Sequence, residues 1–323
     1  MNIRLLTSAE DLIQYDQWVK QHPQGSLWQS LERKQYLESL EKEVRIYGTV
    51  DEATALVVID KTSFGLSTWE IPRGPLVKGH GTSDMGQLLL KNIFKDAKKE
   101  GALSVYLSPI EPVTCPLSPV TSQRHVHADA TRIVDLSLPE AEILAQMHEK
   151  GRYNIKVAQK HGVIIEESKD MNGWMKLIAE TSSRDGFTPV SRAKYEAFLK
   201  HLPGSFLLLA STAEGTLISG LIGVTWNGTG IYYYGASSSE HRNLMAPYLL
   251  QWEAMKRCKA LNCHSYDLLG VAPENAKPNH PWQGISSFKA KFGGKVISYP
   301  PEQEVVLKPM MKQLLGLKRK ILG

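Results

Sequence analysis

The segment 281–294, with the sequence PWQGISSFKAKFGG, gathers aromatic rings, lysines and a pair of glycines near the end of the chain. Its large apolar residues recur at helical spacing: Trp282, Ile285, Phe288 and Phe292. Gly293 follows the last of them, which is the usual stop signal for a helix. One interpretation is therefore a helix that buries this apolar face. The other is that the aromatic rings hold the ammonium group of Lys289 at a reaction centre.

The elements that must position this segment follow a pattern that occurs twice in the chain. Residues 100–112 (EGALSVYLSPIEP) and 261–273 (LNCHSYDLLGVAP) each indicate the end of a helix, a strand and a proline-bounded loop. Residue 112 corresponds to residue 273, an offset of 161 residues, and the same offset carries Gly74 onto Gly235. We therefore expect one structural unit in two copies.

Each copy is predicted to contain a hairpin, a further strand, a long helix and a last strand. In the second copy these are 205–212 with 216–226, then 230–237, 246–261 and 265–270; in the first they are 44–50 with 55–60, then 67–74, 85–101 and 103–109. This order, preceded by a helix, resembles the GNAT acyltransferase fold. The predicted class is α/β (α+β mixed sheets), with tandem GNAT-like domains over 1–136 and 137–323 and a cleft between them.

Composition places the chain among ordinary globular proteins. It has 323 residues, 42% hydrophobic and 22% charged, and a mean hydropathy of −0.25, with no apolar run long enough to cross a bilayer. Charged residues interrupt the amino terminus, so no signal peptide is expected and the protein is predicted to be cytoplasmic. Three cysteines support neither a disulfide framework nor a metal site. A net charge of +5 permits anionic partners without demanding them.

Coenzyme A is disfavoured as the acyl donor. A GNAT enzyme seats the coenzyme's pyrophosphate on backbone amides of a glycine-bearing turn before its main helix. In the corresponding stretch 240–247, Met245 occupies the place of the glycine, and GTSDMGQ in the first copy also lacks the pattern. Without the glycine the backbone cannot approach a pyrophosphate closely. We therefore expect another acyl carrier and no cofactor.

Five segments together resemble the Fem family, the tRNA-dependent aminoacyltransferases of peptidoglycan bridge synthesis (FemA, FemB and FemX). They are QMHEKGRYNI (146–155), SRDGF (183–187), YYYGAS (232–237), HRNLMAPY (241–248) and PWQGISSFKAKFGG. The resemblance covers nearly the whole chain, in a short form without the coiled-coil arm of some members. It implies transfer of an amino acid from its tRNA to the side-chain amine of the stem peptide's third residue. UDP-MurNAc-pentapeptide or lipid II would be the acceptor.

The resemblance also assigns roles to single residues. Attack of an amine on an ester passes through an oxyanion, which a fixed cation stabilises. Lys289 would be that cation, and Phe288 would stack on the terminal adenosine of the tRNA. The alternative is that Phe288 belongs to the core and Lys289 to a solvated helix face.

The resemblance gives the acceptor a second group of residues. Lys34 and Tyr234 resemble residues that contact the acceptor in the family, and Arg184 and Arg242 are further candidates. Each could instead be a surface cation or a sheet tyrosine. At Ser108 the family often has aspartate, and a serine can hydrogen-bond but carries no charge, so acceptor recognition is expected to differ there.

Three assignments stay open at the level of sequence. Asp267 closes the last strand of the second copy, but no residue stands out as a general base. Arg152, Lys156 and Lys160 form a basic stripe that either meets tRNA phosphates or is a solvated face. The tail 308–323 is a basic amphipathic helix that either lies on an anionic membrane, at its inner face, or packs on the protein.

Two other functions compete with aminoacyl transfer. A GNAT-like N-acyltransferase that uses acyl-CoA would need the glycine turn that the chain lacks. A non-catalytic protein that binds tRNA or a cell-wall precursor would not need the pair Phe288 and Lys289. The preferred hypothesis is therefore the enzyme, with aminoacyl-tRNA as donor.

Overall fold

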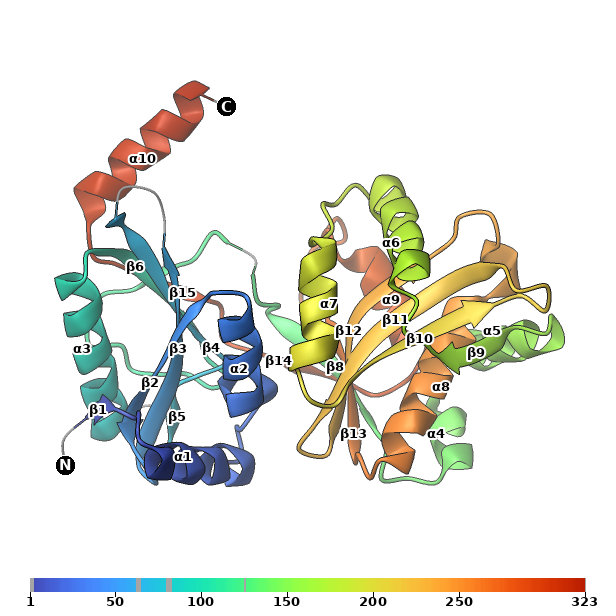
Figure 1. The fold of residues 1–323 in the computed structure, drawn as a ribbon, viewed down its shortest axis with the longest axis horizontal. Coiled ribbons are helices and arrows are strands. Elements are labelled where there is room, and N and C mark those ends of the chain that lie inside the picture. Colours follow the sequence, from blue (N-terminus) through green and yellow to red (C-terminus); the bar gives the residue numbers. More distant parts are fainter. Residues whose placement is uncertain (1–2, 62–64, 80–82, 125, 323) are drawn as a thin grey trace. The chain divides into compact units, whose positions relative to one another are not determined.

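The computed structural model describes residues 3–61, 65–79, 83–124 and 126–322, and in 316–322 it describes the backbone only. The chain folds into two compact units (Figure 1). The first comprises Met1–His127 and Tyr299–Gly323, and the second comprises Ala128–Ser298. Each unit has its own mixed sheet and its own hydrophobic core.

The first unit is built on a sheet with the strand order β1-β2-β3-β4-β6-β15-β7, in which β5 also pairs with β3. Strands β4 and β6 are parallel and the other paired strands are antiparallel. The elements are β1 (Arg4–Leu5), α1 (Ala9–Gln21), η1 (Leu27–Gln29), α2 (Leu31–Ser39), β2 (Glu43–Thr49), β3 (Ala53–Lys61), β4 (Ser67–Pro72), β5 (Leu76–Val77), α3 (Asp84–Lys99), β6 (Ala102–Ser108), β7 (Val120–Thr121), β15 (Gln303–Val306) and α10 (Pro309–Leu322).

The second unit is built on a sheet with the order β14-β8-β13-β12-β11-β10-β9, in which β12 and β13 are the parallel pair. Its elements are β8 (Ala130–Asp135), α4 (Glu140–Gln146), α5 (Glu149–Lys160), β9 (Ile164–Glu167), α6 (Met171–Asp185), α7 (Arg192–His201), β10 (Ser205–Ser211), β11 (Leu217–Trp226), β12 (Thr229–Ser237), η3 (Arg242–Leu244), α8 (Ala246–Ala260), β13 (Ser265–Gly270), α9 (Gln283–Ala290) and β14 (Lys295–Ser298).

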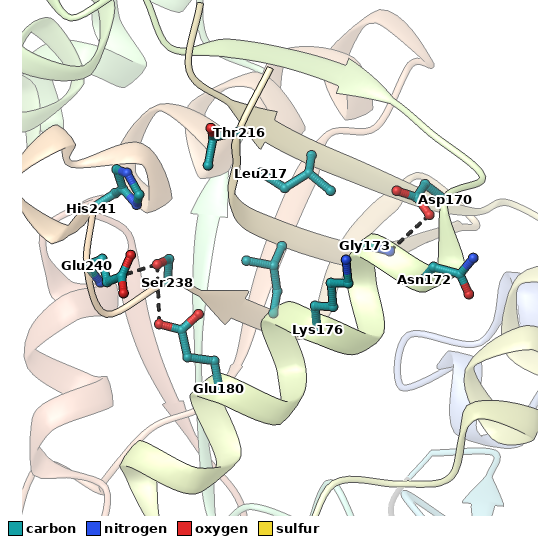
Figure 2. A pocket seen from close by; sticks show the side chains of 11 residues that line it. Asp170, Asn172, Gly173, Lys176, Glu180, Thr216, Leu217, Ser238, Glu240 and His241 are labelled. Atoms are coloured by element: carbon teal, nitrogen blue, oxygen red, sulfur yellow. Dashed lines mark hydrogen bonds between the residues drawn. The ribbon is translucent and has the colours of Figure 1, made fainter. Parts of the chain in front are cut away.

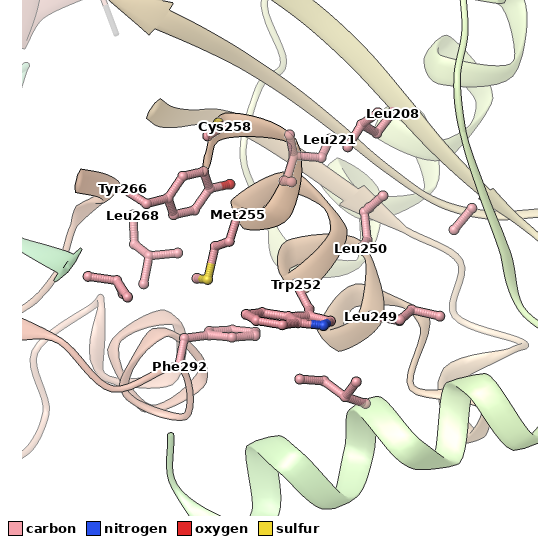
Figure 3. Packing of buried hydrophobic residues seen from close by; sticks show 14 of the residues in the cluster. Leu208, Leu221, Leu249, Leu250, Trp252, Met255, Cys258, Tyr266, Leu268 and Phe292 are labelled. Carbon is pink, nitrogen blue, oxygen red and sulfur yellow. The ribbon is translucent and has the colours of Figure 1, made fainter. Parts of the chain in front are cut away.

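Helices cover both faces of the second sheet (Figure 1). Successive strand residues point to opposite faces. A Cβ on Gly220 would lie 3.1 Å from the Trp174 ring of α6, whereas Leu221 belongs to the cluster that contains the buried side of α8. Figure 3 shows that cluster, to which both Phe292 and Trp252 belong. Burial of such large side chains contributes roughly 1.5–3 kcal/mol each, so this core fixes the segment that carries Lys289.

The predicted repeat is confirmed by the order of the elements. Helices α1, α2 and α3 of the first unit correspond to α6, α7 and α8 of the second, and strands β2, β3, β4 and β6 correspond to β10, β11, β12 and β13. Their first residues differ by values close to the offset of 161 that the sequence indicates. For example, α2 begins at Leu31 and α7 at Arg192.

The observed division differs from the expected boundary between residues 136 and 137. Strand β8 follows the first copy in the chain but pairs with β13 and β14. Strand β15 follows the second copy but pairs with β6 and β7. The second sheet therefore includes the strand that lies between the two copies, and the first sheet includes a strand that follows the second copy.

Among the described helices, none is both long enough and apolar enough to cross a bilayer.

Candidate active site

The second sheet opens between its two parallel strands. Strands β12 and β13 pair from Thr229 opposite Ser265 to Ile231 opposite Asp267, and β12 then continues to Ser237 beside β11 but without β13. In the first unit the equivalent pair, β4 and β6, shifts register between Ser67 and Thr68 but stays paired as far as Pro72 opposite Ser108. Ligands of open α/β sheets bind outside the carboxyl ends of strands. The opening between β12 and β13 is therefore the candidate active site of the second unit.

A β-bulge lies where β12 leaves its neighbour. Ile222 of β11 faces Tyr234 and the next residue, Gly223, faces Tyr232, so that Tyr233 is the extra residue. A bulge re-aims side chains, and here two successive rings contact the same partner in α7. The ring centroid of Phe198 lies 4.7 Å from that of Tyr233 and 5.8 Å from that of Tyr234. Tyr234 is therefore part of an aromatic cluster.

Lys289 lies at the opening of the sheet. Its Nζ donates to the carbonyl oxygen of Gly270, the last residue of β13, at 2.7 Å, and lies 5.7 Å from the ring centroid of Tyr232. The residue is only 6% exposed. Burial lowers the pKa of Lys289 to about 8, although the negative charge of Asp267 acts in the opposite direction. The site thus holds a desolvated cation that is mostly protonated at neutral pH.

The helical interpretation of the segment 281–294 is confirmed in part, because Ile285 of the predicted buried face is exposed, and the placement of Lys289 at a reaction centre stays a prediction. Helix α9 is a true helix, and Phe292 directly beyond it is fully buried in the core of the second unit. Gly293 and Gly294 both have left-handed backbones, with φ of 77° and 73°. A Cβ on Gly294 would stand 2.3 Å from the carbonyl oxygen of Ile133, so the backbone requires glycine there. Helix α9 carries Lys289 and holds it at the opening of the sheet.

Phe288 lies in an aromatic cluster at the same helix. Its ring centroid is 5.1 Å from that of Tyr248 and 5.2 Å from that of Phe292, with the rings edge to face. The side chain is half-buried and packs against the core. Core packing is therefore established for Phe288, and stacking on the adenosine stays a prediction.

Two of the arginines predicted from the sequence, Arg184 and Arg152, donate to backbone carbonyl groups nearby. Arg184 donates to the carbonyl oxygen of Ser237 at 2.9 Å and forms an ion pair with Asp185. Arg152 donates to the carbonyl oxygens of Ala145 and Met147, at the end of α4. Arg242 is exposed in η3. The exposed lysines of the stripe, Lys156 and Lys160, lie on α5.

The predicted residues of the first unit lie on α2 and β6. Lys34 forms an ion pair with Glu38 at 2.6 Å, one turn along the helix. The buried hydroxyl of Ser108 donates to the carboxylate of Glu302 at 2.7 Å. A carboxylate therefore lies beside the position where the sequence has serine. The sequence did not indicate Glu302, because it comes from a segment 194 residues away.

Glu302 belongs to a buried charge cluster at the ends of β4 and β6. Arg124 forms ion pairs with Glu302 at 2.6 Å and with Glu70 at 2.9 Å, and its guanidinium lies 3.6 Å from the centroid of the Tyr106 ring. Burial acts to raise the pKa of Glu70, but His127 and Arg124 outweigh it and lower that pKa to about 2. We call these four ionisable residues the Glu70 cluster: Glu70, Arg124, His127 and Glu302.

A separate pocket of about 420 Å³ lies between α6, the start of β11 and the loop after β12 (Figure 2). Glu180 on α6 accepts from the Ser239 backbone at 2.5 Å and from the Ser238 hydroxyl at 3.2 Å, and the first of these bonds holds the pKa of Glu180 below its usual value. Exposed charges of both signs line the rest, including Lys176 and Asp170. None of the residues around Lys289 lines this pocket.

The architecture is that of tandem GNAT proteins. A tandem GNAT protein from the clavulanic acid biosynthesis pathway superposes with a TM-score of 0.59 at 12% identity, over 95% of this chain and 98% of that one. A crystal structure of FemX gives a TM-score of 0.80 at 18% identity, over 97% and 99%. A conserved protein of unknown function from Bacteroides thetaiotaomicron gives 0.62 at 11%, over 95% and 100%. At these identities the matches establish the fold alone.

The family follows from the sequence. The model of the FemAB family matches residues 8–115, 119–214 and 208–317, which is nearly the whole chain, and the chain belongs to this family. A search of curated proteins returned no match. Family membership supports an acyltransferase role in general, and it confirms the predicted resemblance.

Proposed function

We propose that this protein moves an amino acid from its tRNA ester to the amine of a peptidoglycan stem peptide, as part of interpeptide bridge formation. The observation that carries the proposal is the buried Lys289 ammonium at the opening between β12 and β13. Membership of the FemAB family and the fold shared with FemX support it. The reaction is proposed to take place in the cytoplasm, where aminoacyl-tRNA is made.

The proposed chemistry needs one fixed cation. The acceptor amine attacks the ester carbonyl of the aminoacyl-tRNA, and the carbonyl oxygen takes up negative charge. Lys289 stabilises that oxyanion, and a preorganised charge of this kind contributes roughly 3–4 kcal/mol to the transition state. The C–O bond to the ribose then breaks, and the ribose oxygen leaves with a proton that the amine releases. The products are an amide and a tRNA with a free terminal hydroxyl.

The remaining residues are proposed to bind the two substrates. Lys34, Tyr234 and Ser108 would contact the acceptor, UDP-MurNAc-pentapeptide or lipid II, with Arg184 and Arg242 as further contacts. Phe288 would stack on the terminal adenosine of the tRNA. For Ser108 we propose that the neighbouring Glu302 supplies the carboxylate that the family often carries at that position, because the serine hydroxyl already donates to it.

Coenzyme A is not the proposed donor. Met245 has a left-handed backbone, with φ of 54°, at the start of α8, and its side chain packs against the core. A bulky side chain therefore occupies the turn where a pyrophosphate would need bare backbone. Failure of the purified protein to bind acetyl-CoA would agree with this proposal.

The proposal is tested by incubating the purified protein with a pool of charged tRNAs and either acceptor, and weighing the acceptor by mass spectrometry. A gain of one amino-acid residue on UDP-MurNAc-pentapeptide or lipid II supports aminoacyl transfer and identifies donor and acceptor together. No gain with either acceptor, from protein that is folded, would favour the non-catalytic binding protein.

The basic stripe gives a prediction for tRNA binding. We expect the double variant Lys156→Ala, Lys160→Ala to weaken tRNA binding and to lower the slope of log affinity against log salt by about 1–2, because each lysine at a phosphate releases about one counterion. Filter binding across a salt series measures the slope. Lys194→Ala, Lys200→Ala, on exposed positions of α7, is the matched control. An unchanged slope would assign the stripe to a solvated face.

Helix α10 is proposed to contact an anionic membrane. Met310 is 78% exposed and Leu314 is 59% exposed, so packing of this face on the protein is not what the described residues show. Lys312 is held by Glu304 at 2.5 Å. The sequence from 305 to 323 contains five basic residues and no acidic one. The side chains of Leu317, Lys318, Arg319, Lys320 and Ile321 lie outside the described part of the chain.

Vesicle binding tests the membrane contact. We expect the full chain to co-sediment with vesicles that contain phosphatidylglycerol and not with pure phosphatidylcholine, since each basic residue near an anionic surface contributes roughly 1 kcal/mol. Met310→Ser, Leu314→Ser and, separately, Lys318→Gln, Arg319→Gln, Lys320→Gln should each reduce binding by about tenfold or more. Ile13→Ser, at a 60% exposed position on α1, is the control. Equal binding to both lipids would remove the proposal.

A further inference from the structure

Strand β13 ends irregularly, next to Lys289. Asp267 pairs with Ile133 of β8, and the next pair joins Gly270 to Thr131, so that Leu268 and Leu269 together oppose a single residue. Leu269 has a left-handed backbone, with φ of 55°. That conformation is costly for a branched side chain, on the order of 1–3 kcal/mol, and persists only where neighbouring groups hold it. The bulge therefore needs a support.

The carboxylate of Asp267 is that support. Its Oδ1 accepts the backbone N–H of Leu269 at 2.7 Å and the hydroxyl of Thr131 from the neighbouring strand. The first bond folds the chain back onto its own side chain two residues earlier, in the manner of an Asx turn. Asp267 is only 7% exposed, so water competes little for these bonds. The carboxylate thus fixes both sides of the bulge.

The bulge decides where the Gly270 carbonyl points. This carbonyl accepts from Lys289 Nζ at 2.7 Å. Gly270 is closely surrounded, because a Cβ there would lie 3.0 Å from both the Trp282 ring and Ala128. A shift of the β13 end would therefore move the acceptor away from the ammonium, or force its neighbours to move.

Two ionisable groups face the ammonium from the strands on either side of the opening. From β13 comes the charge of Asp267, which attracts the ammonium and opposes the effect of burial. From β12 comes the ring of Tyr232, and burial raises the pKa of that phenol to about 12, so it is neutral at physiological pH. Asp267 is thus a negatively charged group whose field favours the ionised form of Lys289.

We propose that Asp267 is a positioning residue for Lys289: it locks the bulge that presents the Gly270 carbonyl to the ammonium, and its negative charge stabilises that ammonium. The inference rests on the proposed role of Lys289 in transfer. It differs from a role as general base, because Asp267 is proposed to act through the bulge and Lys289, with its Oδ1 accepting from Thr131 and Leu269.

The test measures the titration of Lys289 itself, without any substrate. Lysine labelled with ¹³C at Cε is incorporated into the full chain, and the Lys289 resonance is assigned by its loss in Lys289→Met. In Asp267→Asn, which keeps an acceptor oxygen but no charge, we expect the pKa of Lys289 to fall by about one unit or more below its wild-type value. Tyr266→Phe, a conservative change at the neighbouring buried position, is the control and should leave that pKa unchanged.

The pH profile of transfer gives the second readout. In Asp267→Asn the loss of transfer at high pH should begin at lower pH than in the wild type, by the same shift as the titration. A purely structural Asp267 would lower the rate without moving the profile, and an unmoved titration in folded Asp267→Asn would overturn the proposal. If the titration moves but wild-type protein transfers nothing, the coupling stands and the proposed function fails.

A second variant covers a failure of Asp267→Asn to fold. Thr131→Val keeps the charge of Asp267 and removes the hydroxyl that donates to its Oδ1. We expect it to lower kcat of transfer several-fold and to leave KM for the acceptor near the wild-type value, because the geometry at Gly270 loosens. Unchanged kcat together with an unchanged Lys289 resonance would count against the positioning role.

Discussion

The Lys289→Met variant is expected to fold like the wild type and to lose at least about a hundredfold in the rate of aminoacyl transfer. Methionine has a similar length and is apolar, so it fits the buried site that Lys289 occupies beside the Tyr232 ring. Burial already disfavours the charged form of Lys289, so loss of that charge should not lower the free energy of unfolding. The rate falls because the oxyanion loses its fixed cation.

The measurement is single-turnover transfer from charged tRNA, with thermal unfolding as the check on folding. Lys291→Met is the matched control, because Lys291 follows in the same segment and is half-exposed. It should transfer at the wild-type rate. If Lys289→Met also transferred at that rate, Lys289 would not be the cation that stabilises the oxyanion.

The same assignment predicts how the wild-type rate depends on pH. The ammonium is present below the pKa of Lys289, about 8, and is lost as pH rises through it. The rate of transfer should therefore decline above about pH 8. Between pH 6 and 7 the titration of Lys289 should not change the rate, because the ammonium stays protonated. A decrease in the rate of transfer as pH falls from 7 to 6 would have to come from the protonation of a group other than Lys289.

The repeat and the placement of the Lys289 segment could be predicted from the sequence because both depend on local patterns. The spacing of apolar residues predicted the helix that is observed as α9, although this helix ends at Ala290, before Phe292 and Gly293, and its buried residue is Lys289. These signals lie within about ten residues of one another. An offset of 161 between two copies is also visible without any knowledge of pairing.

Features that depend on distant partners could not be predicted in this way. The pairing of β15 with β6 joins residues 303–306 to the first copy. No local sequence pattern indicates which sheet such a short strand joins. The bulge at Leu269 is held by the side chain of Asp267 and a threonine 136 residues earlier. The sequence places Asp267 at the close of the last strand of the second copy without a role, and only the contacts show what it supports.

The Glu70 cluster gives the prediction with the largest effect on stability. The pKa of Glu70 is about 2 in the folded protein and 4.5 is its ordinary value, so the folded state favours the ionised carboxylate. The corresponding stabilisation is present above pH 4.5 and is lost as pH falls from 4.5 towards 2. It amounts to about 3 kcal/mol, since each pKa unit corresponds to roughly 1.4 kcal/mol.

We therefore expect Glu70→Gln to lower the free energy of unfolding of the first unit by about 3 kcal/mol at pH 7, and to flatten its loss between pH 4.5 and 2. Hydrogen exchange of β4 and β6 amides, measured across that range, reports on this unit separately. Glu100→Gln is the control, because Glu100 pairs with Arg45 at a position 42% exposed, where an ion pair contributes less than about 1 kcal/mol. Equal effects of the two variants would show that burial of Glu70 among His127 and Arg124 does not stabilise the unit.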